Sequence, residues 1–159
     1  MTGPDFDEEP AEHRRFARYL HDLEAVDESD EADLVAVVLG DQDTTMAESA
    51  VGRHMDRRAA QLLATAAFTL WTDTMADVIA DHDFLTRRLH EWRLLRTIVM
   101  GDPWAVDEVT GASDWFQRTA TTTQIVSSPE ALRLLRDHGR TRRIRNAASH
   151  RLDQLEQRT

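Results

Sequence analysis

Apolar residues recur every three or four positions along most of this chain, which is the spacing of one face of an α-helix. The sequence therefore predicts an all-α fold, an irregular helical bundle or a short α-solenoid of about six to eight helices. We expect one all-α domain over residues 10–159 and a disordered acidic leader over residues 1–9. The clearest amphipathic stretches are residues 10–25, 30–39, 46–80, 84–100, 113–121 and 128–155.

Capping residues predict where several of these helices begin. Thr45 and Glu48 have the spacing of a capping box, so we expect a helix to start near Met46 and to break near Met55 and Asp56. Asp102 as N-cap and Pro103 at the first helical position predict another helix start directly after Gly101.

The C-terminal stretch predicts two short helices with a tight corner between them. Ser128 is a suitable N-cap for the first helix, and Pro129 suits its first position. Gly139 can end that helix in a left-handed conformation. The second helix carries apolar residues on one face, namely Ile144, Ala148, Leu152 and Leu155.

One segment has two interpretations. Residues 35–39 (VAVVL) are rich in β-branched residues and could form a short strand. We prefer a helix that ends at Gly40, because no other segment offers a convincing partner strand.

Between positions 56 and 80, apolar side chains occupy most of the circumference of the predicted helix, which indicates a central, buried helix or a pair of helices. Together with the stripes on the neighbouring helices, this pattern predicts a core. We expect these large side chains to be buried: Leu63, Leu70, Leu89, Trp92 and Leu135.

Charge is distributed unevenly over the 159 residues, whose net charge is -10. Residues 1–48 hold 15 acidic residues and 3 arginines, whereas residues 133–159 hold 8 arginines and 3 acidic residues. This balance argues against nucleic-acid affinity for the whole chain. The basic end suits a phosphate, an acidic protein partner or the chain's own acidic residues.

Two surfaces are candidates for binding. The first is the basic C-terminal helix, and the second is the region around Trp104 and Trp115, which flank a predicted corner. Core packing is the alternative role for these two tryptophans. The arginines of the first surface are Arg140, Arg142, Arg143, Arg145 and Arg151.

The helix–corner–helix pattern of residues 128–152 resembles HEAT-like and leucine-rich-variant α-helical repeats. Residues 37–50 show a similar pattern, in which an apolar helix, a polar corner and a second helix follow one another. The resemblance covers about a third of the chain. It implies an α-solenoid scaffold with a binding surface.

Residues 145–150 (RNAASH) also resemble the RxxxxH motif of HEPN-type ribonucleases. In that family the motif is catalytic at a dimer interface, without a metal. The resemblance implies that Arg145 stabilises phosphate charge, His150 transfers protons and Asn146 is the polar neighbour. On one helix Arg145 and His150 lie about 140° apart, so a homodimer would have to complete the site.

Other motifs are missing. The chain has no cysteine, no paired-histidine zinc motif, no glycine-rich phosphate loop and no GxSxG elbow. We therefore expect neither a metal nor a cofactor, and we interpret Asp81-His82-Asp83 as a helix cap. No apolar run reaches the roughly 20 residues of a membrane span, and no signal-peptide pattern is present. We expect a cytoplasmic protein without a membrane partner.

These observations favour a non-enzymatic interaction or regulatory module that binds a protein partner, one with an acidic surface in particular. The alternative is a HEPN-like, dimeric ribonuclease, the one interpretation in which nucleic acid is a partner.

Overall fold

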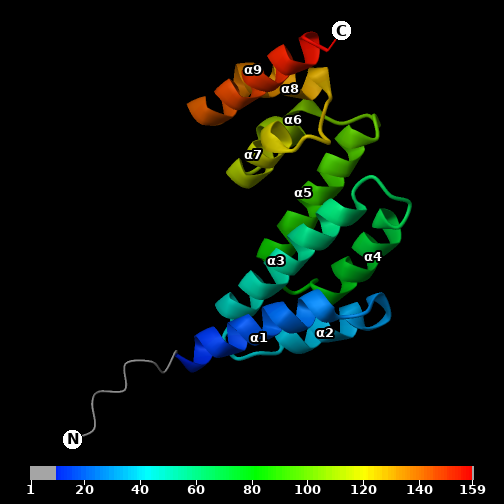
Figure 1. Ribbon diagram of the computed structural model, residues 1–159, viewed down its shortest axis with the longest axis vertical. Coiled ribbons are helices and arrows are strands. Elements are labelled where there is room, and N and C mark those ends of the chain that lie inside the picture. Colours follow the sequence, from blue (N-terminus) through cyan, green and yellow to red (C-terminus); the bar gives the residue numbers. More distant parts are fainter. Residues whose placement is uncertain (1–9, 159) are drawn as a thin grey trace, which may run out of the picture. The chain divides into compact units, whose positions relative to one another are not determined.

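The computed structural model describes residues 10–158, in which all regular structure is helical (Figure 1). This confirms the all-α prediction. The leader expected over residues 1–9 lies outside the described residues. The helices are α1 (Ala11–Ala25), α2 (Glu31–Leu39), α3 (Thr44–Leu62), α4 (Phe68–Val78), α5 (Asp83–Val99), α6 (Val106–Thr110), α7 (Asp114–Thr122), α8 (Pro129–His138) and α9 (Arg142–Glu156), with a 3-10 turn η1 (Glu28–Asp30) before α2.

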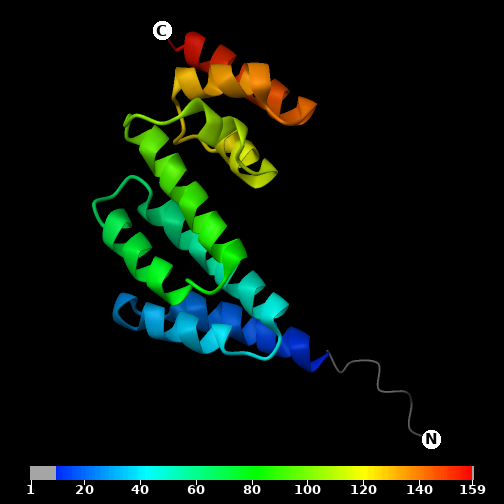
Figure 2. The same cartoon turned by 180° about the vertical axis from the view of Figure 1, so that it is seen from behind.

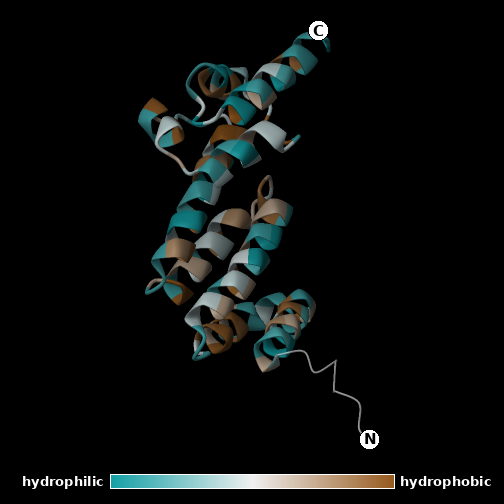
Figure 3. Ribbon diagram, turned by 90° about the vertical axis from the view of Figure 1, so that its left-hand side faces the viewer, coloured by the Kyte–Doolittle hydropathy of each residue, from teal (hydrophilic) through white to brown (hydrophobic). Residues whose placement is uncertain are grey.

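The described residues divide into two compact units. Unit 1 comprises residues 10–61 and 69–88, and unit 2 comprises residues 62–68 and 89–158. The expectation of a single domain stays a prediction. In Figure 3, hydrophobic and hydrophilic residues follow one another along most helices, as expected of amphipathic helices with one buried face.

In unit 1, the segment VAVVL forms the last part of α2, so the strand alternative is wrong. Val35 and Val38 are fully buried whereas Val37 is exposed, which is the spacing of a helix with one buried face. Helices α1 and α2 lie side by side (Figures 1 and 2). The core residues of this unit are Leu23, Val35, Val38, Ala47, Ala50, Val51, Met55, Ala59, Trp71, Met75, Ile79 and Leu85.

In unit 2, α8 and α9 form a closely packed pair (Figures 1 and 2). The predicted start of α8 is confirmed, because Ser128 Oγ accepts a hydrogen bond from Ala131 N at 3.2 Å. The predicted left-handed Gly139 is wrong, since its φ is -56°. Glycine is required there for space: a Cβ would lie 2.5 Å from Leu135 O and 2.8 Å from Ile144 Cγ2.

A helix does start near Met46, but the predicted capping box of Thr45 and Glu48 is wrong. Helix α3 begins at Thr44, because Asp43 Oδ1 accepts a hydrogen bond from Met46 N at 3.1 Å and serves as the cap. Glu48 of the expected capping box binds His82 instead, with Oε1 2.9 Å from Nδ1. The break expected near Met55 lies at residues 63–67.

The helix expected after Gly101 does not start there. Gly101 has φ 74°, and Asp102 N donates to Thr97 O at 3.0 Å, so both residues complete the end of α5. The next helix, α6, begins only at Val106.

Four of the five predicted core residues are buried, but Leu70 is 74% exposed. The break at residues 63–67 changes the phase of the helical pattern. Trp71 and Met75 then occupy the buried face of α4, and Leu70, one position before Trp71, is turned about 100° away from it.

The contrast between Leu89 and Leu70 yields a prediction about stability. Leu89→Ala removes a buried side chain and should lower the free energy of unfolding by about 2–5 kcal/mol. Leu70→Ala, the matched control, should change it by less than about 0.5 kcal/mol. Urea denaturation followed by circular dichroism measures both. Equal effects would show that the buried face of either α4 or α5 is assigned wrongly.

Candidate functional site

The C-terminal arginines do not form one continuous surface. Arg142 and Arg143, at the start of α9, are exposed. Arg140 Nη1 donates to Ala112 O at 2.9 Å, and Arg145 Nη1 donates to Gly139 O at 2.8 Å. These two arginines therefore hold neighbouring backbone in place, whereas the side chains of Arg142 and Arg143 make no hydrogen bond or ion pair within residues 10–158.

Arg151 lies inside unit 2. It is 7% exposed, and its Nη2 donates to Val126 O at 2.8 Å, so it secures the segment between α7 and α8. Its Nε and Nη1 have no hydrogen-bond partner among the described residues. Arg151, which the sequence placed on the basic binding surface, is thus buried, because it shares the buried face of α9 with Ile144 and Ala148.

The exposed Arg143 lines a hollow between α7 and α9, which we call the α7–α9 hollow. Its volume is about 280 Å³. A second arginine, Arg118, lines it from α7, and neither arginine forms an ion pair with a carboxylate in the described part of the chain. The lining residues are Arg118, Thr121, Thr122, Arg143, Ile144 and Ala147.

The hydroxyl groups of this hollow are already engaged. Thr121 Oγ1 donates to a backbone carbonyl of α7, with Gln117 O and Arg118 O both at 3.0 Å, and Thr122 Oγ1 donates to Arg118 O at 2.8 Å. Arg118 Nε donates to Asp114 O at 3.4 Å, so the terminal N–H groups of Arg118 and the guanidinium group of Arg143 are the donors that remain for a ligand. These groups suit an anion.

The two tryptophans of the second predicted surface are both half-buried. Trp115 packs edge-on against Trp92 of α5, with ring centroids 5.3 Å apart. This contact places Trp115 in the packing of unit 2, the alternative role that its sequence position allowed.

The three residues of the HEPN-like motif lie along α9. Arg145 is held at Gly139 O, Asn146 is exposed, and His150 is exposed with its Nε2 3.2 Å from Gln154 Nε2. Among residues 10–158, the arrangement brings neither Arg145 nor Asn146 into a hydrogen bond with His150. The ribonuclease hypothesis keeps its requirement for a second copy.

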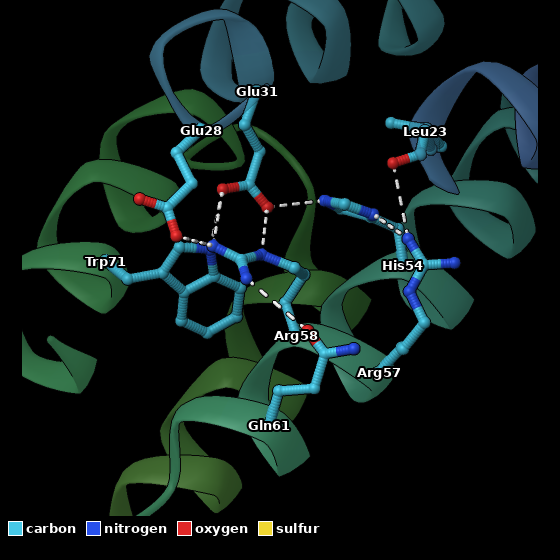
Figure 4. Close-up of polar contacts among 8 residues, drawn as sticks. All are labelled: Leu23, Glu28, Glu31, His54, Arg57, Arg58, Gln61 and Trp71. Carbon is cyan, nitrogen blue, oxygen red and sulfur yellow. Dashed lines mark hydrogen bonds and ion pairs between the residues drawn. The ribbon is translucent and has the colours of Figure 1, made fainter. Parts of the chain in front are cut away.

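Sequence reasoning missed a buried polar cluster in unit 1, which we call the Glu31 centre (Figure 4). Glu31 of α2 is 5% exposed and receives hydrogen bonds from two other helices. From α3, His54 Nε2 lies 2.6 Å and Arg58 Nε 2.9 Å from Glu31 Oε2. From α4, Trp71 Nε1 lies 3.1 Å from Oε1. The Glu31 centre therefore joins α2, α3 and α4.

These donors keep the Glu31 carboxyl ionised. Burial alone would raise its pKa, but the hydrogen bonds from His54, Arg58 and Trp71 outweigh burial and lower the pKa from 4.5 to about 2. A carboxylate with this pKa is a permanent anion near neutral pH.

A second hollow borders the Glu31 centre, with a volume of about 120 Å³. Beside it, Arg57 Nη2 lies 3.0 Å from His54 Nδ1 and 3.2 Å from Leu23 O (Figure 4). We call it the His54 hollow, and its lining residues are Leu23, Glu24, Val26, Glu28, Glu31, His54, Arg57, Arg58 and Gln61.

A helical-wheel argument could have found Glu31. It precedes Val35 by four positions and Val38 by seven, so it lies on the same buried face of α2. Its partners could not be identified in this way, because they come from helices that are 23 to 40 positions away along the chain.

No group of three metal-ligating side chains occurs in residues 10–158, and His82 is paired with Glu48. None of the helices in this range has the length and apolar character to cross a membrane. Comparison of the chain with known protein families, curated protein sequences and solved structures finds no match.

The lowered pKa of Glu31 predicts how stability depends on pH. Because the folded pKa is below the unfolded value, the stabilisation by this carboxylate is present above about pH 4.5 and is lost as the pH falls towards 2. Glu31→Gln should therefore cost about 3 kcal/mol at pH 7 and progressively less at lower pH. Denaturant titrations at pH 7, 5 and 3 measure this difference.

Glu28→Gln is the control for this prediction. The Glu28 side chain is 82% exposed and lies 3.5 Å from Arg58, so its loss should change stability by less than about 0.5 kcal/mol. A Glu31→Gln cost that stays constant from pH 7 to pH 3 would contradict the assignment of a permanently ionised Glu31.

Proposed function

We propose that this protein is a non-enzymatic helical interaction module that binds an acidic segment of a partner protein in the α7–α9 hollow. The observation that carries the proposal is the pair Arg118 and Arg143, which line the hollow without a carboxylate partner among the described residues. Their charges are uncompensated locally, so an acidic ligand complements them.

The chemistry of the hollow suits a carboxylate on a hydrocarbon stem. The planar guanidinium group can bind both oxygens of one carboxylate. Ile144 and Ala147 supply apolar wall next to the two arginines and can contact the methylene groups of a glutamate side chain. The exposed Arg142, which precedes Arg143 on α9, extends the positive charge beyond the hollow.

The engaged hydroxyl groups support binding in preference to a reaction. Thr121 and Thr122 donate to helix carbonyls, so neither hydroxyl is oriented by a neighbouring base as a nucleophile would be. A regulatory role through partner binding is the function that this surface supports best.

The test uses two labelled peptides, hexaglutamate and hexaglutamine, and fluorescence anisotropy at low salt. The wild type should bind hexaglutamate and not hexaglutamine. Arg118→Glu with Arg143→Glu should weaken that binding by roughly tenfold or more, because two attractive contacts become repulsive. Added salt should weaken wild-type binding as well, since exposed charges are screened.

Arg87→Glu with Arg133→Glu is the charge-matched control. It changes the net charge by the same amount at exposed positions that do not line the hollow. An equal loss of binding in both double variants would show that overall charge, and no particular site, attracts the peptide. Circular dichroism should show unchanged helix content in both variants.

The ribonuclease hypothesis is tested on the same preparation. Wild-type protein is incubated with mixed RNA beside His150→Ala. If the wild type cleaves RNA and His150→Ala does not, the HEPN-like ribonuclease replaces the interaction module as the proposed function.

A further inference from the structure

Hydrogen-bond geometry determines which nitrogen of His54 carries the proton. The guanidinium group of Arg57 has N–H donors and no acceptor, so His54 Nδ1, 3.0 Å from Arg57 Nη2, accepts. The ring proton is then on Nε2 and is donated to Glu31 Oε2 at 2.6 Å. In this state, His54 is neutral and both of its nitrogens are engaged.

The same Arg57 nitrogen also caps the C-terminal end of helix α1. Leu23 is the third residue from the end of α1, and its carbonyl is one of the last four, which have no partner within the helix. Arg57 Nη2 donates to Leu23 O at 3.2 Å. The last turn of α1 has no basic residue of its own, so Arg57 supplies from α3 the positive charge that favours a helix C-terminus.

We propose that His54 and Arg57 form a proton-sensitive latch that fastens the C-terminal end of α1 to α3. The latch is closed while His54 is neutral. It opens when a proton binds Nδ1, because this nitrogen then becomes a donor facing the donor of Arg57.

Two opposite charges lie on either side of the His54 ring, the Glu31 carboxylate at Nε2 and the Arg57 guanidinium at Nδ1. Glu31 remains a carboxylate and keeps its hydrogen bond from Nε2 in both states, so protonation changes only the Nδ1 side. There the imidazolium and Arg57 would be like charges about 3 Å apart, and Arg57, on the rim of the hollow, can move into solvent. The charged groups that line the His54 hollow are Glu24 of α1, Glu28 of η1, Glu31 of α2, and Arg57 and Arg58 of α3. Arg53 of α3 lines a neighbouring hollow together with Glu24, His54 and Arg57.

Opening should be local to the end of α1. Asp41 accepts hydrogen bonds from Tyr19 Oη at 2.7 Å and from Arg15 Nε at 3.2 Å, which anchors the earlier part of α1 without His54. Since the open state binds one proton more than the closed state, acidification favours opening. Residues 21–27 should respond to pH, while the part of α1 around Arg15 should not.

The experiment follows backbone amide exchange and the histidine ring signals of the full chain by NMR, from pH 8 to pH 5 at constant ionic strength. As His54 gains its second proton, protection of the amides of residues 21–27 should fall by about tenfold, the effect expected for losing a hydrogen bond from a charged donor. Exchange rates are corrected for the intrinsic pH dependence of unstructured amides. The His54→Gln variant identifies the His54 signals.

Two variants separate the latch from general loosening. Arg57→Met removes the latch, so residues 21–27 should be weakly protected at pH 8 and show no further loss at pH 5. Arg53→Met, the matched control one turn earlier on α3, should keep the wild-type response, because no hydrogen bond from Arg53 to the ring of His54 exists among the described residues.

His54→Gln provides an independent check, because its amide can still donate to Glu31 but cannot take up a proton. It should abolish the pH response between pH 8 and pH 5. Three results would each overturn the proposal: protonation of His54 with unchanged protection, a pH response that persists in Arg57→Met, or a His54 that takes up no second proton before the whole chain unfolds.

Discussion

Unit 1 depends on one constraint, the burial of the Glu31 carboxylate. A charge removed from water must be satisfied by hydrogen bonds, and α2 itself offers no donor for it. The donors come from His54 and Arg58 on α3 and from Trp71 on α4, so the packing of these three helices supplies the hydrogen bonds that the anion needs. Desolvation offsets much of the attraction in a network of this kind, whereas the loss of one partner leaves the other charges buried without compensation.

Unit 2 has a neutral counterpart in Gln117 of α7, which is fully buried. Its Nε2 donates to Val109 O at 2.9 Å, and its Oε1 accepts from Arg140 N at 2.9 Å. One side chain thus joins α6, α7 and the corner before α9. This corner directly precedes the first turn of α9, from which Arg143 lines the α7–α9 hollow.

Arginine has two distinct roles in this protein. Some arginines, such as Arg140, Arg145 and Arg151, bind backbone carbonyls and hold chain segments in place. Others, such as Arg118 and Arg143, line a hollow with no acidic residue in its lining, although Arg118 Nε also donates to Asp114 O within its own helix. Arg57 belongs to the first class, and the nitrogen that donates to Leu23 O also donates to the ring of His54.

Local chemistry determined the helices, because each amphipathic stripe and each well-placed cap acts within a few residues. Ser128 starts α8 and Gly40 ends α2 as the sequence indicates. The sequence predictions failed where neighbouring signals competed. Asp43 caps α3 in place of Thr45, and the break at residues 63–67 leaves Leu70 exposed.

Only the tertiary structure decided what the polar side chains do. Arg145 and Arg143 are indistinguishable in sequence, yet one binds Gly139 O and the other lines a hollow. Glu31 can be placed on the buried face of its helix from the sequence, but His54, Arg58 and Trp71 cannot be named as its partners. The physical reason is that a charge or hydrogen bond is defined by its surroundings, and those surroundings come from segments far apart along the chain.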